Sequence, residues 1–171
     1  MAIFLPQNHK NSKFHQKDKI YMSFIFKTFD ELSVNELYDL LKLRAEIFVV
    51  EQNCVYNDLD DFDKEAVHIF YIENGEIIAT ARLLQPGTRF ADFSIGRVVV
   101  KKEKRGTGLG QALMNAAIDY CVSKWKAEKI KISAQQYLQR FYGELGFVVV
   151  TEMYLEDGIP HVGMIYKTNH L

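Results

Sequence analysis

The sequence has few of the features that would assign a protein to a specialised class. Only two of its 171 residues are cysteines, and Cys54 and Cys121 lie in dissimilar surroundings, which excludes a disulfide framework and the spacing of a zinc site. The formal net charge is −1, so binding to nucleic acid through bulk charge is excluded as well. No apolar run reaches about 18 residues, and we therefore expect no transmembrane helix and no membrane partner.

The remaining composition is that of an ordinary globular protein, with 48% hydrophobic and 25% charged residues. The chain begins with a short apolar patch and continues with a polar, basic stretch, the reverse of the order in a signal peptide. We therefore expect a cytoplasmic protein with reduced thiols. We interpret residues 1–21 as a loosely ordered N-terminal extension, with Met22 as an alternative start, and residues 22–171 as a single domain.

Alternating strand and helix patterns predict one α/β domain. The strand-like runs are 23–29, 67–84 (a hairpin around Asn74-Gly75), 93–100, 129–134 and 147–166, and the helical runs are 33–52, 109–121 and 136–145. The hairpins require antiparallel pairs, whereas each strand–helix–strand unit favours a parallel pair. The sequence therefore predicts a mixed central sheet flanked by helices.

Two of the helices carry an apolar stripe. In the first helix the predicted core face is Val34, Leu37, Tyr38, Leu41, Ala45 and Phe48. In the second helix the predicted core face includes Leu109, Leu113, Ala117 and Tyr120. Ser33 and Glu36 form the capping-box pattern that begins the first helix.

The segment KKEKRGTGLG, residues 101–110, has the features of an anion-binding turn. It carries four basic residues and leads through three glycines into a helix N-terminus, where free N–H groups and the helix dipole attract anions. A P-loop is excluded, because no Lys-Ser or Lys-Thr follows the glycines. A dinucleotide-binding turn fits poorly, because five charged residues separate the glycines from the preceding strand.

A third anion-binding pattern, [RQ]-x-x-G-x-[GA], is matched at each fixed position by Arg105, Gly108 and Gly110. Downstream, the segment FYGELGF (141–147) matches the motif F-Y-x-x-x-G-F. With both motifs in this order, the chain resembles the GNAT family of N-acetyltransferases, and the segments LRAEIFVVEQ, IGRVVV, FYGELGF and DGIPHVGM resemble its ElaA-type subgroup. The resemblance covers most of residues 23–168 and implies the GNAT fold, in which two parallel strands of the mixed sheet splay apart.

The resemblance also implies a binding site for acetyl-CoA as co-substrate, with no metal. Its pyrophosphate would lie on the loop Arg105, Gly106, Thr107, Gly108, Leu109 and Gly110, and its pantetheine arm along Val98, Val99 and Val100. Gln135 stands where the family commonly has an asparagine, and its amide would still donate to the co-substrate. Tyr142 is the expected general acid that protonates the departing thiolate.

The same resemblance fixes neither the general base nor the acceptor. Glu51 and His161 are our first two candidates for the base, ahead of Glu46 and His68. The expected acceptor is a primary amine on a small molecule or a peptide. We expect the acidic loop with Asp58, Asp60, Asp61 and Asp63 to be a solvated surface loop. The alternative is that this loop recognises a cationic amine. No nucleic acid is expected as a partner, and a homodimer is left open.

Two rival functions use the same motifs. Arg44 to Phe48 faintly matches the RxxVF segment of acyl-homoserine-lactone synthases, although the complete loop at 105–110 favours CoA over a carrier protein. A non-catalytic acyl-CoA-binding module is the other alternative, and Tyr142 argues against it.

Overall fold

A computed structural model describes residues 23–168, so the extension predicted for residues 1–21 lies outside the described residues. The strands are β1 (Ile25–Thr28), β2 (Val67–Glu73), β3 (Glu76–Leu84), β4 (Phe93–Val100), β5 (Lys129–Gln135), β6 (Val148–Val149), β7 (Tyr154–Glu156) and β8 (Ile159–Lys167). The helices are α1 (Val34–Ala45), α2 (Leu109–Trp125) and α3 (Gln139–Glu144). Short helical turns are η1 (Phe29–Glu31), η2 (Glu46–Glu51), η3 (Phe62–Glu65), η4 (Lys102–Lys104) and η5 (Gln136–Leu138).

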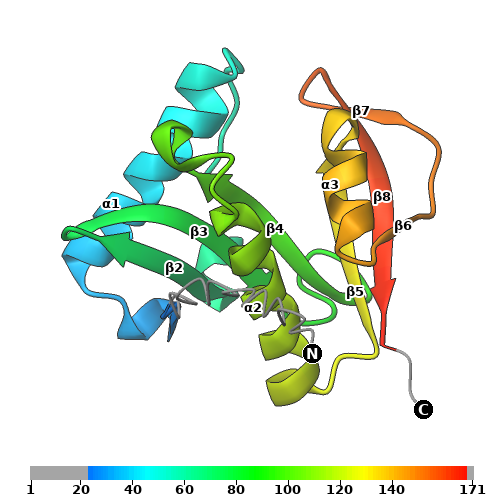
Figure 1. Cartoon of the computed structure of the whole chain (residues 1–171), viewed down its shortest axis with the longest axis horizontal. Helices are drawn as coiled ribbons and strands as arrows, with labels where there is room; N and C mark the ends of the chain where they lie inside the picture. Colours follow the sequence, from blue (N-terminus) through cyan, green and yellow to red (C-terminus); the bar gives the residue numbers. More distant parts are fainter. Residues whose placement is uncertain (1–22, 169–171) are drawn as a thin grey trace, which may run out of the picture.

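The strands of the described part form one mixed sheet with the order β1-β2-β3-β4-β5-β8-β6, and β7 pairs with β8. Strands β4 and β5 are parallel, and only Phe93 with Ile130 and Ser94 with Lys131 are in register. Beyond Ser94 the two strands diverge, so the sheet consists of two arms joined at one end (Figure 1). The predicted mixed sheet with splayed parallel strands is therefore confirmed.

Helix α2 packs on the sheet through the face that its sequence predicts. Leu109, Leu113 and Ala117 are at most 3% exposed, while Tyr120 is half-buried and stacks on Phe26. Burying a leucine side chain contributes about 1.5–3 kcal/mol to folding. This helix therefore anchors the glycine turn before it firmly to the core.

The apolar stripe predicted for the first helix is confirmed only in part. Leu41 and Phe48 pack against the core, but Val34 and Tyr38 are 85% and 68% exposed. The buried residues of α1 are Leu40, Leu43 and Arg44. Hydrophobic periodicity does not count a charged side chain, and the buried Arg44 belongs to the true core face. After Ala45 the helix widens into the π-helical turn η2, a geometry that is frequent at functional sites.

Candidate functional site

The glycine turn presents a row of unused backbone donors. Gly106 and Gly108 have φ of 73° and 87°, a conformation that favours glycine, and Gly108 is the N-cap of α2. Within residues 23–168 the backbone N–H groups of 106–111 donate to no protein acceptor. Thr107 closes the turn by donating its hydroxyl to the carbonyl of Lys104 at 2.7 Å. This arrangement matches the anion site that the sequence predicts.

The edge of β4 that faces β5 is open where the two strands diverge. The Lys101 N–H donates to the Ile78 carbonyl of β3 at 2.8 Å. Because backbone groups alternate between the two edges of a strand, those of Val98 and Val100 face the open edge. The carbonyl of Val100 accepts a hydrogen bond from Nε of Arg105 at 3.1 Å, which agrees with this orientation. The open edge is available to a ligand that pairs as an extra strand would.

A β-bulge lies in the same part of β4. The register shifts between the pairs Thr80–Val99 and Arg82–Gly96, and Arg97 within the bulge has a φ of 51°. A non-glycine residue in this region is uncommon and persists only where its surroundings hold it. The bulge bends β4 where its edge becomes open.

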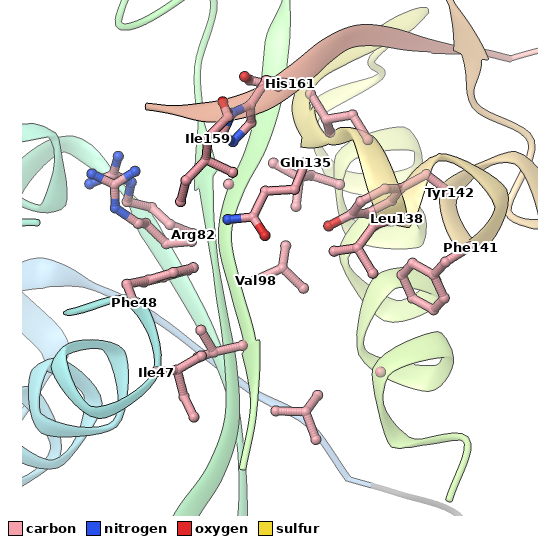
Figure 2. Close-up of a pocket in the computed structure, with 18 of the residues that line it drawn as sticks. Ile47, Phe48, Arg82, Val98, Gln135, Leu138, Phe141, Tyr142, Ile159 and His161 are labelled. Atoms are coloured by element: carbon pink, nitrogen blue, oxygen red, sulfur yellow. The ribbon is translucent and has the colours of Figure 1, made fainter. Parts of the chain in front are cut away.

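The open edge and the glycine turn line one cavity of about 730 Å³ between the two arms. Val98, Val99 and Val100 line it with Arg105, Gly106, Gly108 and Gly110. Figure 2 shows Val98 facing the side chains of Gln135, Leu138 and Tyr142 across this space. The cavity continues past these residues to His161 and Ile159 of β8 and to Arg82 of β3.

Tyr142 points its hydroxyl into the cavity (Figure 2), and the side chain is 7% exposed. Helical spacing would put Tyr137, Phe141 and Leu145 on one core face. Leu145 is buried and Phe141 packs against the core, but Tyr137 is 73% exposed, because it lies in the 3₁₀ turn η5 before α3 begins. Burial raises the pKa of the Tyr142 phenol, so the hydroxyl keeps its proton near neutral pH.

Gln135 lies at the end of β5 and lines the cavity. Its amide nitrogen donates to the side-chain oxygen of Gln52 at 3.0 Å, and Gln52 follows η2 on the opposite arm. This hydrogen bond crosses the space between the arms.

Glu51 and His161 both line the cavity, but their surroundings differ. The carboxylate of Glu51 accepts two hydrogen bonds from the Arg105 guanidinium, at 2.7 and 3.1 Å. These hydrogen bonds hold the pKa of Glu51 below its usual value. His161 is in β8, and its Nδ1 lies 2.8 Å from the carbonyl of Ile159. A carbonyl can only accept, so Nδ1 carries the proton and Nε2 has a lone pair.

His68 and the acidic loop have other roles than those considered from the sequence. His68 is 1% exposed, and its Nε2 lies 2.9 Å from the carbonyl of Asp63, outside the cavity lining. The solvated-loop prediction is wrong for Asp58, Asp60 and Asp63, and it holds for the exposed Asp61 alone. The three carboxylates form ion pairs with the arginines Arg44, Arg82 and Arg97. Their charges are thereby neutralised, so they offer no free binding site for a cationic amine.

A second polar group in the cavity was not anticipated from the sequence. Glu156 of β7 accepts hydrogen bonds from the Ser133 hydroxyl at 2.6 Å and from Nη2 of Arg89 at 2.5 Å. The hydroxyls of Ser133 and Tyr154 lie 2.6 Å apart. Burial alone would raise the pKa of Glu156, but the hydrogen bond from Ser133 and the charge of Arg89 hold it below its usual value. Residues two apart in a strand lie on the same face, so Ser133 shares the face of Gln135. This spacing was the one signal in the sequence that could have indicated the polar group.

The described residues contain no group of three or more histidine, cysteine, aspartate or glutamate side chains that could hold a metal ion. In the same part of the chain, no helix is both long enough and apolar enough to cross a membrane.

Known proteins share both the sequence and this fold. A family model described as an acetyltransferase (GNAT) domain matches residues 35–168. Protein ElaA of Escherichia coli strain K12 is 46% identical over 136 residues, which cover 78% of this chain and 89% of that protein. A UPF0039 protein of Schizosaccharomyces pombe is 39% identical over 145 residues, covering 84% of this chain and 95% of that protein.

The solved structures agree with the sequence relatives. The crystal structure of E. coli ElaA has a TM-score of 0.80 at 41% identity, and it covers 85% of this chain and 99% of that chain. An acyl-CoA N-acyltransferase from Pseudomonas aeruginosa gives 0.79 at 41% identity with the same coverage. A CoA-dependent acyl-homoserine lactone synthase shares the fold at 16% identity, with a TM-score of 0.69 and coverage of 85% and 83%. This chain belongs to the GNAT acetyltransferase family and is of the ElaA type.

Proposed function

We propose that this protein is an N-acetyltransferase that moves an acetyl group from acetyl-CoA directly to a primary amine. The observation that carries the proposal is the continuity of one cavity from the free amides of 106–111, along the open edge of β4, to the buried hydroxyl of Tyr142. The GNAT family uses acyl-CoA, and this cavity has an anion site at one end and a buried acid further in.

The residues present fit the parts of acetyl-CoA. The amides of residues 106–111 and the side chain of Arg105 would hold the pyrophosphate, because a helix N-terminus and a guanidinium both bind anions. Gly106, Thr107, Gly108, Leu109 and Gly110 form this turn. Val98 to Val100 would pair with the amides of the pantetheine arm, and Gln135 would donate from the facing strand.

The residues near the bulge would perform the chemistry. The N–H group of Val98, next to the bulge, faces the cavity and would stabilise the negative charge that develops on the carbonyl oxygen. Tyr142 would donate its proton to the departing sulfur, since burial keeps the phenol protonated. When bound, acetyl-CoA supplies a thioester, whose acyl carbon an amine attacks without a covalent enzyme intermediate.

His161 is our choice for the base that accepts the proton of the amine. Its Nε2 has a lone pair, whereas both oxygens of Glu51 are engaged by Arg105. We assign Glu51 to holding Arg105 beside the glycine turn. The base role of Glu51 stays a prediction that kinetics can test.

The first experiment measures binding and turnover together. Acetyl-CoA should raise the melting temperature, because a ligand that binds only the folded state stabilises it by RT ln(1 + [L]/Kd). Release of free thiol with a panel of primary amines should then exceed the rate without amine. An unchanged melting temperature at millimolar acetyl-CoA would count against the donor. A clear shift without amine-dependent thiol release would favour the non-catalytic module.

A further inference from the structure

The inner part of the cavity, past the bulge, has hydrogen-bond donors on one side and acceptors on the other. The donor side lies where β4 and β5 separate and includes Ser94 of β4 and Arg89 of the β3–β4 loop. The acceptor side lies on the β7–β8 hairpin and includes Glu156 and Nε2 of His161. A substrate amine that carries both hydrogen-bond donors and hydrogen-bond acceptors would match this arrangement.

Ser94 marks the donor side most clearly. Ser94 is a lining residue of the cavity although it is only 3% exposed, and its buried hydroxyl has no hydrogen-bond partner among residues 23–168. A buried hydroxyl without a partner costs free energy, so it is expected to find one in the functional complex. A carboxylate or carbonyl oxygen of a ligand would supply that partner.

Arg89 adds positive charge on the same side. Its guanidinium gives one hydrogen bond, from Nη2 to Glu156, and its other N–H groups have no protein acceptor in the described part of the chain. It lies over the Phe90 ring at 5.3 Å, and the ammonium of Lys131 lies over the same ring at 4.6 Å. A cation and an unpartnered hydroxyl in the lining of the same cavity favour an anionic group.

Glu156 is fixed on the opposite side by Ser133 and Arg89. A purely cationic amine that bound Glu156 would draw it away from Arg89, whose side chain is only 23% exposed, and would leave that charge poorly compensated. A molecule with both an ammonium and a carboxylate can satisfy Glu156 and Arg89 at once. The existing ion pair thus selects for a zwitterion.

The spacing of the two charged groups agrees with a small molecule. Nη2 of Arg89 and Oε1 of Glu156 are 2.5 Å apart, so a ligand that meets both must carry its ammonium and its carboxylate close together. An amino acid or a dipeptide satisfies this condition.

From these observations we propose that the acceptor is a small amine that also carries a carboxylate, an amino acid or dipeptide, with its carboxylate on Arg89 and Ser94 and its amino end towards Glu156 and His161. This inference rests on the proposed N-acetyltransferase function, and it names the substrate class of the same cavity.

The test compares matched acceptors that differ in the carboxylate. Thiol release from acetyl-CoA is measured with L-lysine and cadaverine, L-alanine and ethylamine, and glycylglycine and its carboxy-amide. We expect kcat/KM to be at least about tenfold higher for the best carboxylated acceptor than for its partner. Arg89→Gln should bring this ratio close to one, as expected for the loss of a hydrogen bond to a charged group, and leave the KM for acetyl-CoA unchanged.

Further variants separate recognition from stability. Arg89→Lys should keep part of the preference, Ser94→Ala should reduce it by a smaller factor, and Arg140→Gln, at an exposed arginine outside the cavity, should leave it unchanged. A preference for the decarboxylated amines, or a ratio that neither Arg89→Gln nor Ser94→Ala alters, would overturn the inference while leaving the proposed function intact. No thiol release with any of these amines, and no melting shift with acetyl-CoA, would overturn the proposed function and the inference with it.

Discussion

Burial determines the chemistry available to single residues in this cavity. Tyr142 is almost fully buried and keeps its proton, which suits an acid, whereas Glu51 is bound by Arg105 and keeps its negative charge. Nδ1 of His161 bonds the Ile159 carbonyl of its own strand, which leaves Nε2 for the proposed base role. The chemistry open to each side chain therefore follows from its burial and its hydrogen-bond partners rather than from its residue type alone.

Replacing Tyr142 by phenylalanine removes only the hydroxyl and keeps the edge-to-face contacts with Phe141 and Phe147. If the hydroxyl protonates the departing sulfur, turnover should slow by about 100-fold, the low end for a positioned acid, because a thiolate also leaves without a proton. Affinity for acetyl-CoA should be unchanged. Steady-state kinetics and a cofactor titration check this, and turnover at the wild-type rate would assign Tyr142 a purely structural role.

Replacing Glu51 by glutamine separates its two possible roles. The change removes the negative charge that competes with phosphate for Arg105, so acetyl-CoA should bind several-fold more tightly while turnover slows by less than about tenfold. Calorimetric titration and kinetics are the measurements. If turnover instead slows by about 100-fold or more at unchanged affinity, the base role belongs to Glu51.

Among the elements, the turn before α2 and the open edge of β4 form the candidate binding surface together. The turn depends on left-handed glycines, and the open edge depends on a parallel pair that ends after Ser94. Neither element would bind the whole of acetyl-CoA alone, because one offers only an anion site and the other only a strand edge.

Gly108→Val tests the turn. Gly108 has a φ of 87° and an open space around the position of a Cβ atom, so the strain of valine is in the backbone and costs about 1–2 kcal/mol. The variant should fold and lose the melting shift with acetyl-CoA. Gly75→Val is the matched control, since Gly75 has a φ of 81° and equally open surroundings in the β2–β3 hairpin. Loss of the shift in the control, or its persistence in Gly108→Val, would contradict the anion site.

On the scale of the whole molecule, a buried ionic network fixes the loop after η2 to the sheet. Arg44 and Arg82 are each 1% exposed and bind Asp58, Asp60 and Asp63. Burial alone would raise the pKa values of Asp60 and Asp63, but the hydrogen bonds and charges of the arginines outweigh it and lower both. These carboxylates therefore stabilise the fold above about pH 4, and their contribution is lost as pH falls below that value.

His68 makes the free energy of unfolding depend on pH in a higher pH range than the carboxylates do. Burial lowers the pKa of His68 in the folded protein. Below about pH 6.5 this histidine therefore binds a proton in the unfolded chain more readily than in the folded protein. The free energy of unfolding should therefore fall between pH 7 and pH 5, with a slope of at most about 1.4 kcal/mol per pH unit from this group. Urea unfolding of the wild type and His68→Gln checks this. Equal slopes in the two proteins would show that His68 does not control this range.

The sequence by itself determined the features that depend on neighbouring residues. The glycine turn, the hairpin at Asn74-Gly75 and the core face of α2 follow from φ preferences and periodicity, which act over a few residues. The two motifs at 105–110 and 141–147 were sufficient to indicate the family. The resemblance to that family then implied which strand would lie open.

Only the tertiary structure decided the inner cavity and the buried network. Arg89 and Glu156 are far apart in the chain, and so are Ser94 and Ser133, and the register of β4, β5, β7 and β8 brings them to one cavity. A run of aspartates has the same composition whether it is solvated or buried. Whether it is buried depends on arginines from α1, β3 and β4, because a charge is buried at low cost only where an opposite charge pairs with it.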